Sequence, residues 1–394
     1  MIKKKILIFI DWFYPGYKAG GPISSNLNMV IHLKDDYQFK IITRNTDYTD
    51  TTPYKDIVSN QWTRGIEDAE IFYFSKENLS FRSLKELLQS TEFDFAYING
   101  IYSWYFSILP LWLLGGKNKK IIVCARGMLS SHALGVKSLK KLVYLYLARA
   151  MGLFNNITFH ATNAREQEEI KKLFGKSNIR VAPNFPRKIE NVSCKDKIKI
   201  KGIVKLINIA RIAPEKNTLY LLEILSSVTK PEINIELDLF GSIYNQDYWN
   251  NCLKLIEKLP PNIKVNYKGA LPSGEVMQEL SQNHFMFMPT RGENYGHIII
   301  ESLSAGCPVI ISDQTPWHFP TPVLPLPIGE GAGVGFSGWD IPLSNPPEFI
   351  EVIEHCAAMN QDEYDQMSRN AFAYAQYILN NPETLEANRK LFEE

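Results

Sequence analysis

Cysteine is scarce in this sequence, and the arrangement of the few cysteines excludes several kinds of site. The five are far apart and form no Cys-x-x-Cys pair: Cys124, Cys194, Cys252, Cys307 and Cys356. An odd number at such spacing predicts neither a disulfide framework nor a zinc site, and it fits reduced thiols in a cytosol. The histidines also lack the spacing of metal ligands. We therefore expect no bound metal.

Net charge and long apolar runs are missing as well. Lys and Arg number 43 and Asp and Glu 42, a net charge of +1, which argues against a nucleic-acid partner because such binding needs a basic surface. The apolar run 6–10 ends at Asp11, which predicts a buried strand rather than a signal peptide. The stretch 104–115 is too short for a bilayer and contains Pro110. We expect a cytoplasmic protein without a transmembrane helix.

The apolar residues that are present predict an α/β protein of two domains. A chain of 394 residues exceeds what one core usually organises. Short apolar runs recur between helical patterns, at 6–10, 39–43, 69–74, 93–98, 120–124, 179–182, 204–210, 235–240, 263–267, 284–288 and 308–312. Runs of this length separated by helices are typical of parallel sheets covered on both faces. Two doubly wound, Rossmann-like domains in tandem follow.

Proline and a change in composition mark the expected domain boundary. The sequence Pro183-Asn184-Phe185-Pro186 interrupts the pattern, and a lysine-rich segment comes after it. We place the first domain at 1–185 and the second at 186–375. The remainder, 376–394, should form a C-terminal helix that packs back toward the first domain, following a break at Asn380-Asn381-Pro382.

The first chemical motif follows the run 204–210. Arg211 comes directly after this run, and Pro214 can open a helix just before Lys216. In a doubly wound domain, such a strand-to-helix loop lies at the carboxyl ends of the strands, where ligands bind. Arg211 and Lys216 could therefore neutralise a diphosphate there without a metal.

The second motif follows the run 284–288. A turn with Gly296 leads into a helix whose first amides can hold phosphate oxygens. Glu293 precedes the helix, and Glu301 lies about 12 Å farther along it. The two carboxylates therefore cannot share one atom, but they can face the sugar end and the ribose of an extended nucleotide sugar.

These residues resemble a known family. Glu293-x7-Glu301, with Asn294-Tyr295-Gly296 inside it and Ala305-Gly306-Cys307-Pro308 after it, resembles the family 4 retaining glycosyltransferases of the GT-B fold. The Arg-x-x-x-x-Lys segment from Arg211 to Lys216 looks like the diphosphate motif of the same family. Two motifs in the right order are more specific than either alone.

The N-terminal half carries the same resemblance. Trp-Phe-Tyr-Pro at 12–15, followed by Gly20 and Gly21, is similar to the family's first glycine loop, which approaches the donor phosphates. The segments 125–129 (Ala-Arg-Gly-Met-Leu) and 160–163 (His-Ala-Thr-Asn) resemble the branch that builds capsular, O-antigen and exopolysaccharide chains.

The resemblance implies an arrangement and a reaction. The two domains would face a cleft, with the first binding the acceptor and the second the nucleotide sugar. The donor would be a UDP- or GDP-sugar, and the acceptor a glycan or a lipid-linked glycan. Transfer would retain the anomeric configuration and would need no cofactor. Because no assured carboxylate nucleophile stands out, we expect a same-face mechanism.

The resemblance also implies roles for single residues. Arg211 and Lys216 would stabilise the leaving diphosphate, and Glu301 would bind the ribose hydroxyls. Glu293 would hold the sugar and the distal phosphate with its neighbours in the turn. Those neighbours are Asn294, Tyr295, Gly296 and His297.

Three further contacts are implied away from the two motifs. Gly241 and Leu271 would line the base and the diphosphate edge. Arg126 occupies a position at which many relatives have a histidine, and Asn99 occupies a second position of this kind. The resemblance makes Arg126 a donor or acceptor contact.

Several alternatives stay open. A nicotinamide-dependent oxidoreductase is disfavoured, because no Gly-x-Gly-x-x-Gly follows the first strand and the segment 44–46 (Arg-Asn-Thr) offers no acidic ribose ligand. A nucleotide-sugar epimerase of the same fold, or a non-catalytic nucleotide-sugar binding subunit, would keep the donor motifs. The basic and apolar stretch 135–154 could pack against its sheet or rest on a membrane that carries the acceptor.

Overall fold

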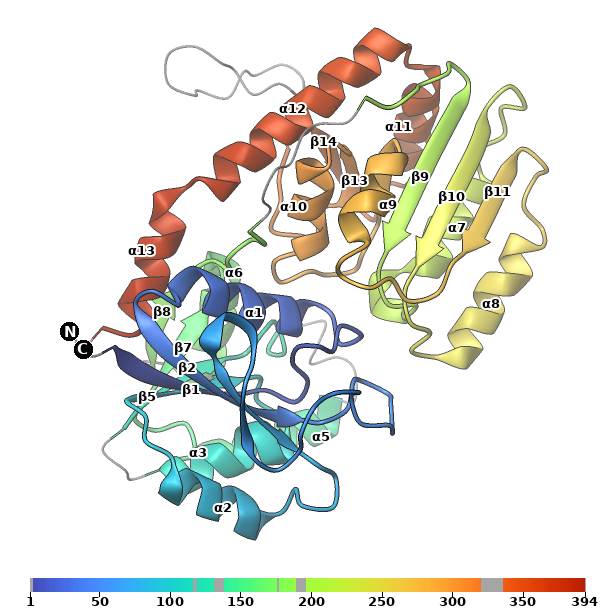
Figure 1. The fold of residues 1–394 in the computed structure, drawn as a ribbon. Helices are drawn as coiled ribbons and strands as arrows, with labels where there is room; N and C mark the ends of the chain where they lie inside the picture. The colour runs from blue at the N-terminus through green and yellow to red at the C-terminus, as the bar shows by residue number, and fades with distance from the viewer. Residues whose placement is uncertain are drawn as a thin grey trace. The chain divides into compact units, whose positions relative to one another are not determined.

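Two sheets organise the chain, and each is the centre of one compact unit (Figure 1). This computed structural model describes residues 3–115, 119–130, 138–175, 177–188, 196–319 and 336–393. Unit 1 comprises Met1–Lys188 and Pro382–Glu394, and unit 2 comprises Ile189–Asn381. Residues 135–137 of the expected basic helix lie outside the described residues, as does Cys194. The other four cysteines are buried free thiols.

Unit 1 contains a sheet of eight strands in the order β3-β4-β2-β1-β5-β6-β7-β8. β3 pairs antiparallel with β4, and the other neighbours pair in parallel. The strands are β1 (Lys4–Phe9), β2 (Tyr37–Arg44), β3 (Trp62–Arg64), β4 (Glu70–Phe74), β5 (Phe95–Asn99), β6 (Lys120–Cys124), β7 (Ile157–Ala161) and β8 (Asn178–Val181). The order reverses between β1 and β5, which is where a doubly wound sheet binds its ligands.

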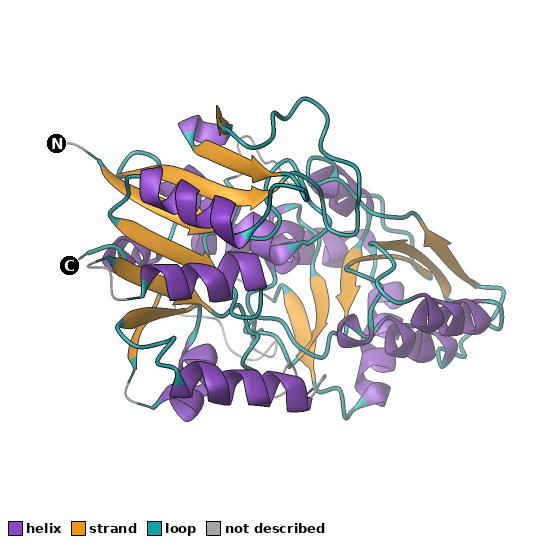
Figure 2. Ribbon diagram, turned by 90° about the horizontal axis from the view of Figure 1, so that it is seen from below, coloured by secondary structure: helices purple, strands orange, loops and turns teal. Residues whose placement is uncertain are grey.

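The helices of unit 1 lie on both faces of this sheet (Figure 2). They do so because its apolar strands send alternate side chains to opposite sides. Leu7 and Phe9 of β1 join a core with α2, α3 and α5, whereas Ile6 and Ile8 join one with α1 and α13. The helical segments are α1 (Gly21–Leu33), η1 (Ile66–Asp68), α2 (Phe81–Ser90), η2 (Trp104–Ile108), α3 (Leu109–Leu114), α5 (Ser138–Ala150), α6 (Ala164–Phe174) and α13 (Pro382–Leu391).

The C-terminal helix α13 is part of unit 1. The Phe392 ring that follows it contacts the rings of Tyr37, Phe95 and Tyr97 at centroid distances of 5.3, 5.6 and 6.1 Å. Arg389 forms an ion pair with Asp36 at 2.8 Å. Apolar burial of Phe392 therefore fixes the end of the chain to the sheet that contains its beginning.

Unit 2 contains six parallel strands in the order β11-β10-β9-β12-β13-β14. They are β9 (Ile203–Ile209), β10 (Asn234–Phe240), β11 (Ile263–Tyr267), β12 (Phe285–Met288), β13 (Val309–Ser312) and β14 (Gly338–Ile341). The helical segments are η3 (Pro214–Lys216), α7 (Thr218–Ser226), α8 (Gln246–Ile256), α9 (Val276–Gln282), α10 (His297–Ser304), α11 (Pro346–Ala358) and α12 (Gln361–Leu379). One core packs α7, α8 and α11 on the sheet, and a second packs α9, α10 and α12.

The predicted architecture of two parallel-sheet α/β domains is therefore confirmed. Three strands escaped the sequence pattern. β3 (Trp-Thr-Arg) and β14 (Gly-Trp-Asp-Ile) are not apolar runs, and threonine and histidine interrupt the apolar residues of β7 (Ile-Thr-Phe-His-Ala). None of the described helices combines the length and the apolar character needed to cross a membrane.

Candidate functional site

Two loops meet at the point where the strand order of unit 2 reverses. β9 lies between β10 and β12, so the loops after β9 and β12 leave the same edge of the sheet side by side. The Glu215 carbonyl joins them: the Thr290 hydroxyl donates to it at 3.1 Å, and the Arg291 amide donates to it at 3.0 Å. The structure thus brings the first and second motifs together.

Asn217 holds the two loops together through hydrogen bonds of its side chain. Its backbone is left-handed, with φ 62°, a conformation that asparagine tolerates better than most residues. Its side-chain amide donates to the Pro289 carbonyl at 3.0 Å, and its side-chain oxygen accepts from the Arg291 Nε at 3.0 Å. The sequence motifs alone did not point to this buried asparagine, although its place just before α7 was a signal.

The predicted diphosphate residues differ in their surroundings. The Arg211 side chain is 34% exposed, lies 3.7 Å from the Glu215 carboxylate, and stacks over the Tyr244 ring at 5.5 Å. Lys216 instead forms an ion pair with Glu293, and each of the two side chains is 17% exposed. Lys216 and Glu293, which are 77 residues apart in the chain, are therefore direct partners.

The turn that contains Glu293 leads into α10. Gly296 has the left-handed φ of 79°, and a Cβ there would lie 2.7 Å from the Ile299 Cδ1, so the turn favours glycine. The Glu293 amide donates to the Gln314 carbonyl at 3.2 Å, and the Trp317 indole donates to the Tyr295 carbonyl. These bonds fix the backbone from Glu293 to Gly296 independently of the glutamate side chain.

The remaining donor candidates of the second motif lie in this turn and on α10. Asn294 and Tyr295 are half-buried, and His297 is the buried first residue of α10. The Tyr295 and His297 rings contact at 4.7 Å. Burial, and then the charge of Glu301, raise the pKa of the Tyr295 hydroxyl well above its ordinary value. Glu301 is half-buried on α10, and its charge acts on the Tyr295 hydroxyl.

Gly241 and Leu271 lie on the neighbouring loops of unit 2. Gly241 has φ 145°, and a Cβ there would lie 1.8 Å from the Ala210 carbonyl oxygen, so only glycine lets the loop after β10 approach the residue before Arg211. Its amide donates to the Gly269 carbonyl at 2.8 Å. Leu271 is half-buried and packs on the core beneath α10, as Tyr295 does.

Gly20 and Gly21 lie in unit 1, at its own point of strand reversal. Gly20 has φ 72° and precedes α1. A Cβ at either glycine would meet no atom of the described residues within 4 Å, so the start of α1 leaves open space. These glycines belong to a different unit from Arg211, Lys216 and Glu293.

Arg126 is held by side chains of unit 1. Its Nε donates to the Asn99 side-chain oxygen at 2.8 Å, its Nη2 donates to the Tyr97 hydroxyl at 3.1 Å, and its Nη1 donates to the Asn184 side chain. Arg126 itself has the left-handed φ of 55°. These bonds give the guanidinium a structural role within unit 1, and its contact with substrate stays a prediction.

A buried histidine extends this network. The His160 Nε2 donates to the Ala182 carbonyl at 2.8 Å, so its Nδ1 accepts from the Tyr97 hydroxyl at 2.8 Å. Burial, and then the charge of Arg126, lower the pKa of His160 to about 3. The neutral histidine therefore orients Tyr97 as an acceptor for Arg126.

Asp11 is a further polar residue at the carboxyl edge of unit 1, and the sequence indicated it only as the end of a strand. Its carboxylate accepts from the Ser103 hydroxyl at 2.8 Å and lies 3.5 Å from Arg44. Burial raises the pKa of Asp11, which Ser103 and Arg44 partly oppose. An acidic residue directly after a buried strand was the available signal.

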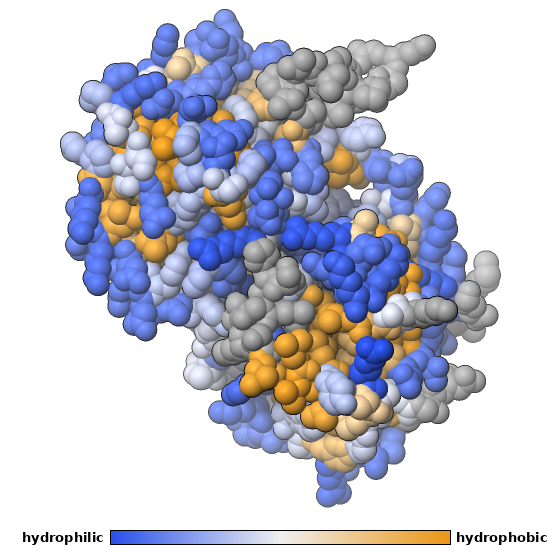
Figure 3. All heavy atoms as spheres, turned by 180° about the vertical axis from the view of Figure 1, so that it is seen from behind, coloured by the Kyte–Doolittle hydropathy of each residue, from blue (hydrophilic) through white to orange (hydrophobic). Residues whose placement is uncertain are grey.

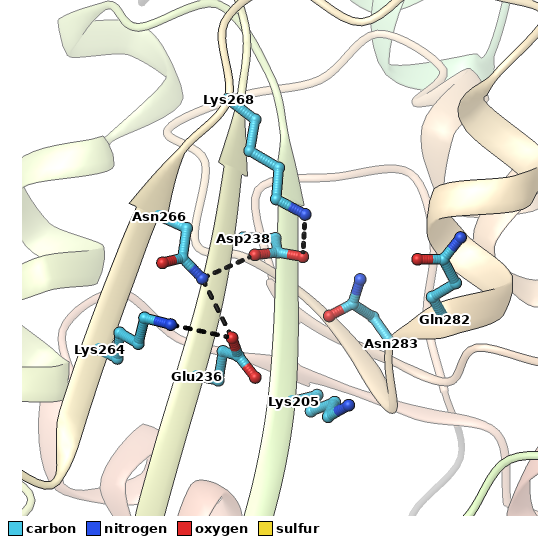
Figure 4. Close-up of a pocket in the computed structure, with 8 residues that line it drawn as sticks. All are labelled: Lys205, Glu236, Asp238, Lys264, Asn266, Lys268, Gln282 and Asn283. Atoms are coloured by element: carbon cyan, nitrogen blue, oxygen red, sulfur yellow. Dashed lines mark hydrogen bonds and ion pairs between the residues drawn. The ribbon is translucent and has the colours of Figure 1, made fainter.

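A groove on one face of the unit 2 sheet is distinct from these loops (Figure 4). Lys268 forms an ion pair with Asp238 at 2.7 Å, and Lys264 lies 3.7 Å from Glu236. The Asn266 amide donates to both carboxylates. Because its acids and lysines neutralise one another, this groove is a poor site for a diphosphate. Among the described residues, no group of three or more metal-ligating side chains is placed to hold a metal ion.

Comparison with known proteins identifies the segment that contains both motifs. Residues 195–318 match the family of glycosyl transferases group 1. The matched segment includes Arg211, Lys216, Glu293 and Glu301. An uncharacterized 41.2 kDa protein in the cps region of Klebsiella pneumoniae is 21% identical to this chain, covering 72% of it and 80% of that protein.

Solved structures match over the whole chain. HepE of Anabaena, solved in complex with UDP and glucose, has a TM-score of 0.68 at 15% identity and covers 98% of both chains. Sucrose-phosphate synthase from Thermosynechococcus elongatus also has a TM-score of 0.68, at 14% identity, covering 99% of this chain and 97% of its own. The fold is therefore GT-B, as the sequence predicted.

Proposed function

We propose that this protein is a glycosyltransferase that transfers a hexose from a UDP- or GDP-sugar, held by unit 2, to a glycan or lipid-linked acceptor in bacterial surface polysaccharide synthesis. The observation that carries the proposal is the junction of two loops at the strand reversal of unit 2, where Arg211, Lys216 and Glu293 gather at the carboxyl edge. The cps-region relative supports the polysaccharide context.

The chemistry of this junction suits the departure of a nucleoside diphosphate. Negative charge grows on the phosphate oxygen as the glycosidic bond breaks, so cations fixed beforehand stabilise the transition state more than the ground state. Arg211 and Lys216 supply these cations, and the Asn217 bonds hold their loop in place. The amides at the start of α10 add donors toward the distal phosphate.

The carboxylates have separate tasks in this proposal. Glu293 binds hydroxyls of the transferred sugar, and Glu301 binds the ribose. Gly241 and Leu271 border the base and the diphosphate. Transfer retains the anomeric configuration on one face of the sugar, with the acceptor proton passing to the departing phosphate oxygen as the new bond forms. Analysis of the product anomer tests this step, and an inverted product would contradict it.

Unit 1 supplies the acceptor side in this proposal, and one of its helices suits a membrane surface. Exposed apolar residues cluster on and after α5, with exposed fractions between 47% and 75%: Leu139, Leu142, Val143, Tyr146, Leu147 and Met151. Figure 3 shows apolar residues gathered on one face of this unit. Lys140, Lys141 and Arg149 lie on the same helix, so anionic lipid would bind both kinds of side chain.

The membrane contact predicts sedimentation with phosphatidylglycerol vesicles at low salt. Replacing Leu142 and Tyr146 by serine should abolish it without loss of stability, since both side chains are exposed. Leu253→Ser, at an exposed apolar position on α8 of unit 2, is the matched control. If wild type stays in the supernatant, the membrane part of the proposal is wrong.

Donor binding is tested by isothermal titration calorimetry with UDP, GDP and UDP-glucose in EDTA. We expect one of these to bind wild type and Arg211→Ala to weaken that binding at least tenfold. Lys254→Ala, at an exposed position on α8, should leave the affinity unchanged. An affinity that Arg211→Ala leaves unchanged would place the donor elsewhere in the protein. Release of an altered nucleotide sugar without transfer would favour the epimerase.

A further inference from the structure

The ion pair between Lys216 and Glu293 joins two residues to which the proposed function gives different parts of the donor. Lys216 is assigned to the diphosphate and Glu293 to the sugar, yet in the structure the two bind each other. Each side chain is 17% exposed, so the pair is shielded from solvent but can be reached by a ligand. A diphosphate at Lys216 would bring further negative charge beside the Glu293 carboxylate.

We propose that Glu293 competes with the diphosphate for Lys216, so that a nucleoside diphosphate alone binds weakly whereas a donor sugar draws the Glu293 carboxylate away. This inference rests on the proposed function and deepens it. Before binding and after sugar transfer, Glu293 returns to Lys216 and displaces the diphosphate. Glu293 thus couples the presence of the sugar to the strength with which Lys216 holds the nucleotide.

The backbone around the pair is held by other bonds, which allows the carboxylate to change partners. The Glu293 amide is bound to Gln314, and the two loops are joined through Thr290 and Asn217. None of these bonds uses the Glu293 side chain. A rotation of that side chain therefore frees Lys216 without opening the junction.

The neighbouring pair of Arg211 and Glu215 provides a comparison on the same loop. Its atoms are 3.7 Å apart and its side chains are 34% and 48% exposed, so water screens it more than the pair of Lys216 and Glu293. Glu215→Gln removes the same charge as Glu293→Gln from the loop that carries Lys216. It is therefore the matched control for a general change in the potential at the site.

The test is titration calorimetry with UDP and, in parallel, GDP, at low and high salt. For the nucleotide that binds, Glu293→Gln should tighten affinity at least fivefold at low salt, with a smaller gain at high salt because salt screens the competing charge. Glu215→Gln should change affinity less than twofold. In a Lys216→Met background the gain from Glu293→Gln should disappear, since the competition acts through Lys216. Thermal unfolding shows whether each variant is folded.

The outcomes separate this inference from the proposed function. If wild type binds a nucleotide and Glu293→Gln leaves that affinity unchanged or weakens it, the proposed competition is wrong but the proposed function stands. A gain in affinity that persists in the Lys216→Met background also overturns it. If neither nucleotide binds wild type or folded Glu293→Gln, the proposed function fails and the competition fails with it.

Discussion

The two units share one architecture but differ in the partners of their predicted site cations. In unit 2, Arg211 and Lys216 remain partly exposed at the carboxyl edge of the sheet and pair with the carboxylates of Glu215 and Glu293. In unit 1, the side chains that accept hydrogen bonds from Arg126 are neutral, among them Asn99 and Tyr97.

This difference predicts at which cation a ligand can replace the present partner at a small cost in free energy. A diphosphate that binds Lys216 replaces one anionic partner by another, so the lysine stays neutralised. A ligand that draws Arg126 away would leave buried amide and hydroxyl oxygens without their donor, which costs about 1–3 kcal/mol for each group. We therefore expect substitutions in unit 2 to impair the reaction and substitutions in the unit 1 network to impair stability.

The largest expected effect is the loss of turnover in Lys216→Ala. Removing one fixed cation from a leaving group typically lowers kcat by about 10²–10³-fold. Turnover of the donor that binds best measures it, with Lys254→Ala as the same-charge control on exposed α8. The unfolding midpoint should change little, because the loops are joined by backbone and Asn217 bonds. Unaltered turnover would remove Lys216 from the reaction.

Arg126→Met should give the opposite result. It removes the Arg126 hydrogen bonds to Asn99, Tyr97 and Asn184, of which Asn99 keeps a second donor in Asn26, so the free energy of unfolding of unit 1 should fall by about 3 kcal/mol. Denaturant unfolding measures this change, and calorimetry should find nucleotide affinity in unit 2 unaltered. A stable variant that loses transfer would instead make Arg126 a substrate contact, as the resemblance implies.

The smallest expected effect concerns pH. The pKa of His160 falls from 6.5 to about 3 on folding, because burial and Arg126 oppose its charge. Only the unfolded chain then binds this proton below pH 6.5, so the contribution of His160 to stability is complete above that pH and is lost progressively down to about pH 3. Between pH 6.5 and 5 the loss is about 2 kcal/mol.

His160→Gln should flatten this part of the stability profile, whereas His355→Gln, at an exposed position on α11, should not. His284 gives unit 2 a similar dependence, since burial lowers its pKa to about 4. The two buried histidines therefore allow the acid sensitivity of each unit to be separated. An unchanged slope in His160→Gln would mean that this histidine is already protonated in the folded protein.

The sequence predicted the fold well because its central strands are buried on both faces and therefore read as continuous apolar runs. The runs at 6–10 and 204–210 correspond to β1 and β9, the first strands of the two sheets. Short edge strands carry a weaker signal, since β3 and β14 contain polar residues or glycine.

The candidate site could be predicted only in part. The Arg211 and Glu293 motifs carry local signals, a cation after a strand and a glycine turn before a helix. The pairing of Lys216 with Glu293 depends on strand order, which brings residues 77 apart into contact. The bonds of Arg126 with Tyr97 and Asn184 likewise depend on the order of β5, β6 and β8, which spacing along the chain does not reveal.

The most direct test of the central claim is transfer of labelled sugar. Purified wild type and Lys216→Ala would each be incubated, in EDTA, with radiolabelled UDP-glucose, other UDP-hexoses and GDP-hexoses together with a bacterial membrane extract. We predict that wild type moves label from one of these donors into a glycan or lipid fraction and that Lys216→Ala does not. Conversion of the donor into a different nucleotide sugar, or recovery of every donor unchanged while one binds tightly, would contradict the proposed transfer.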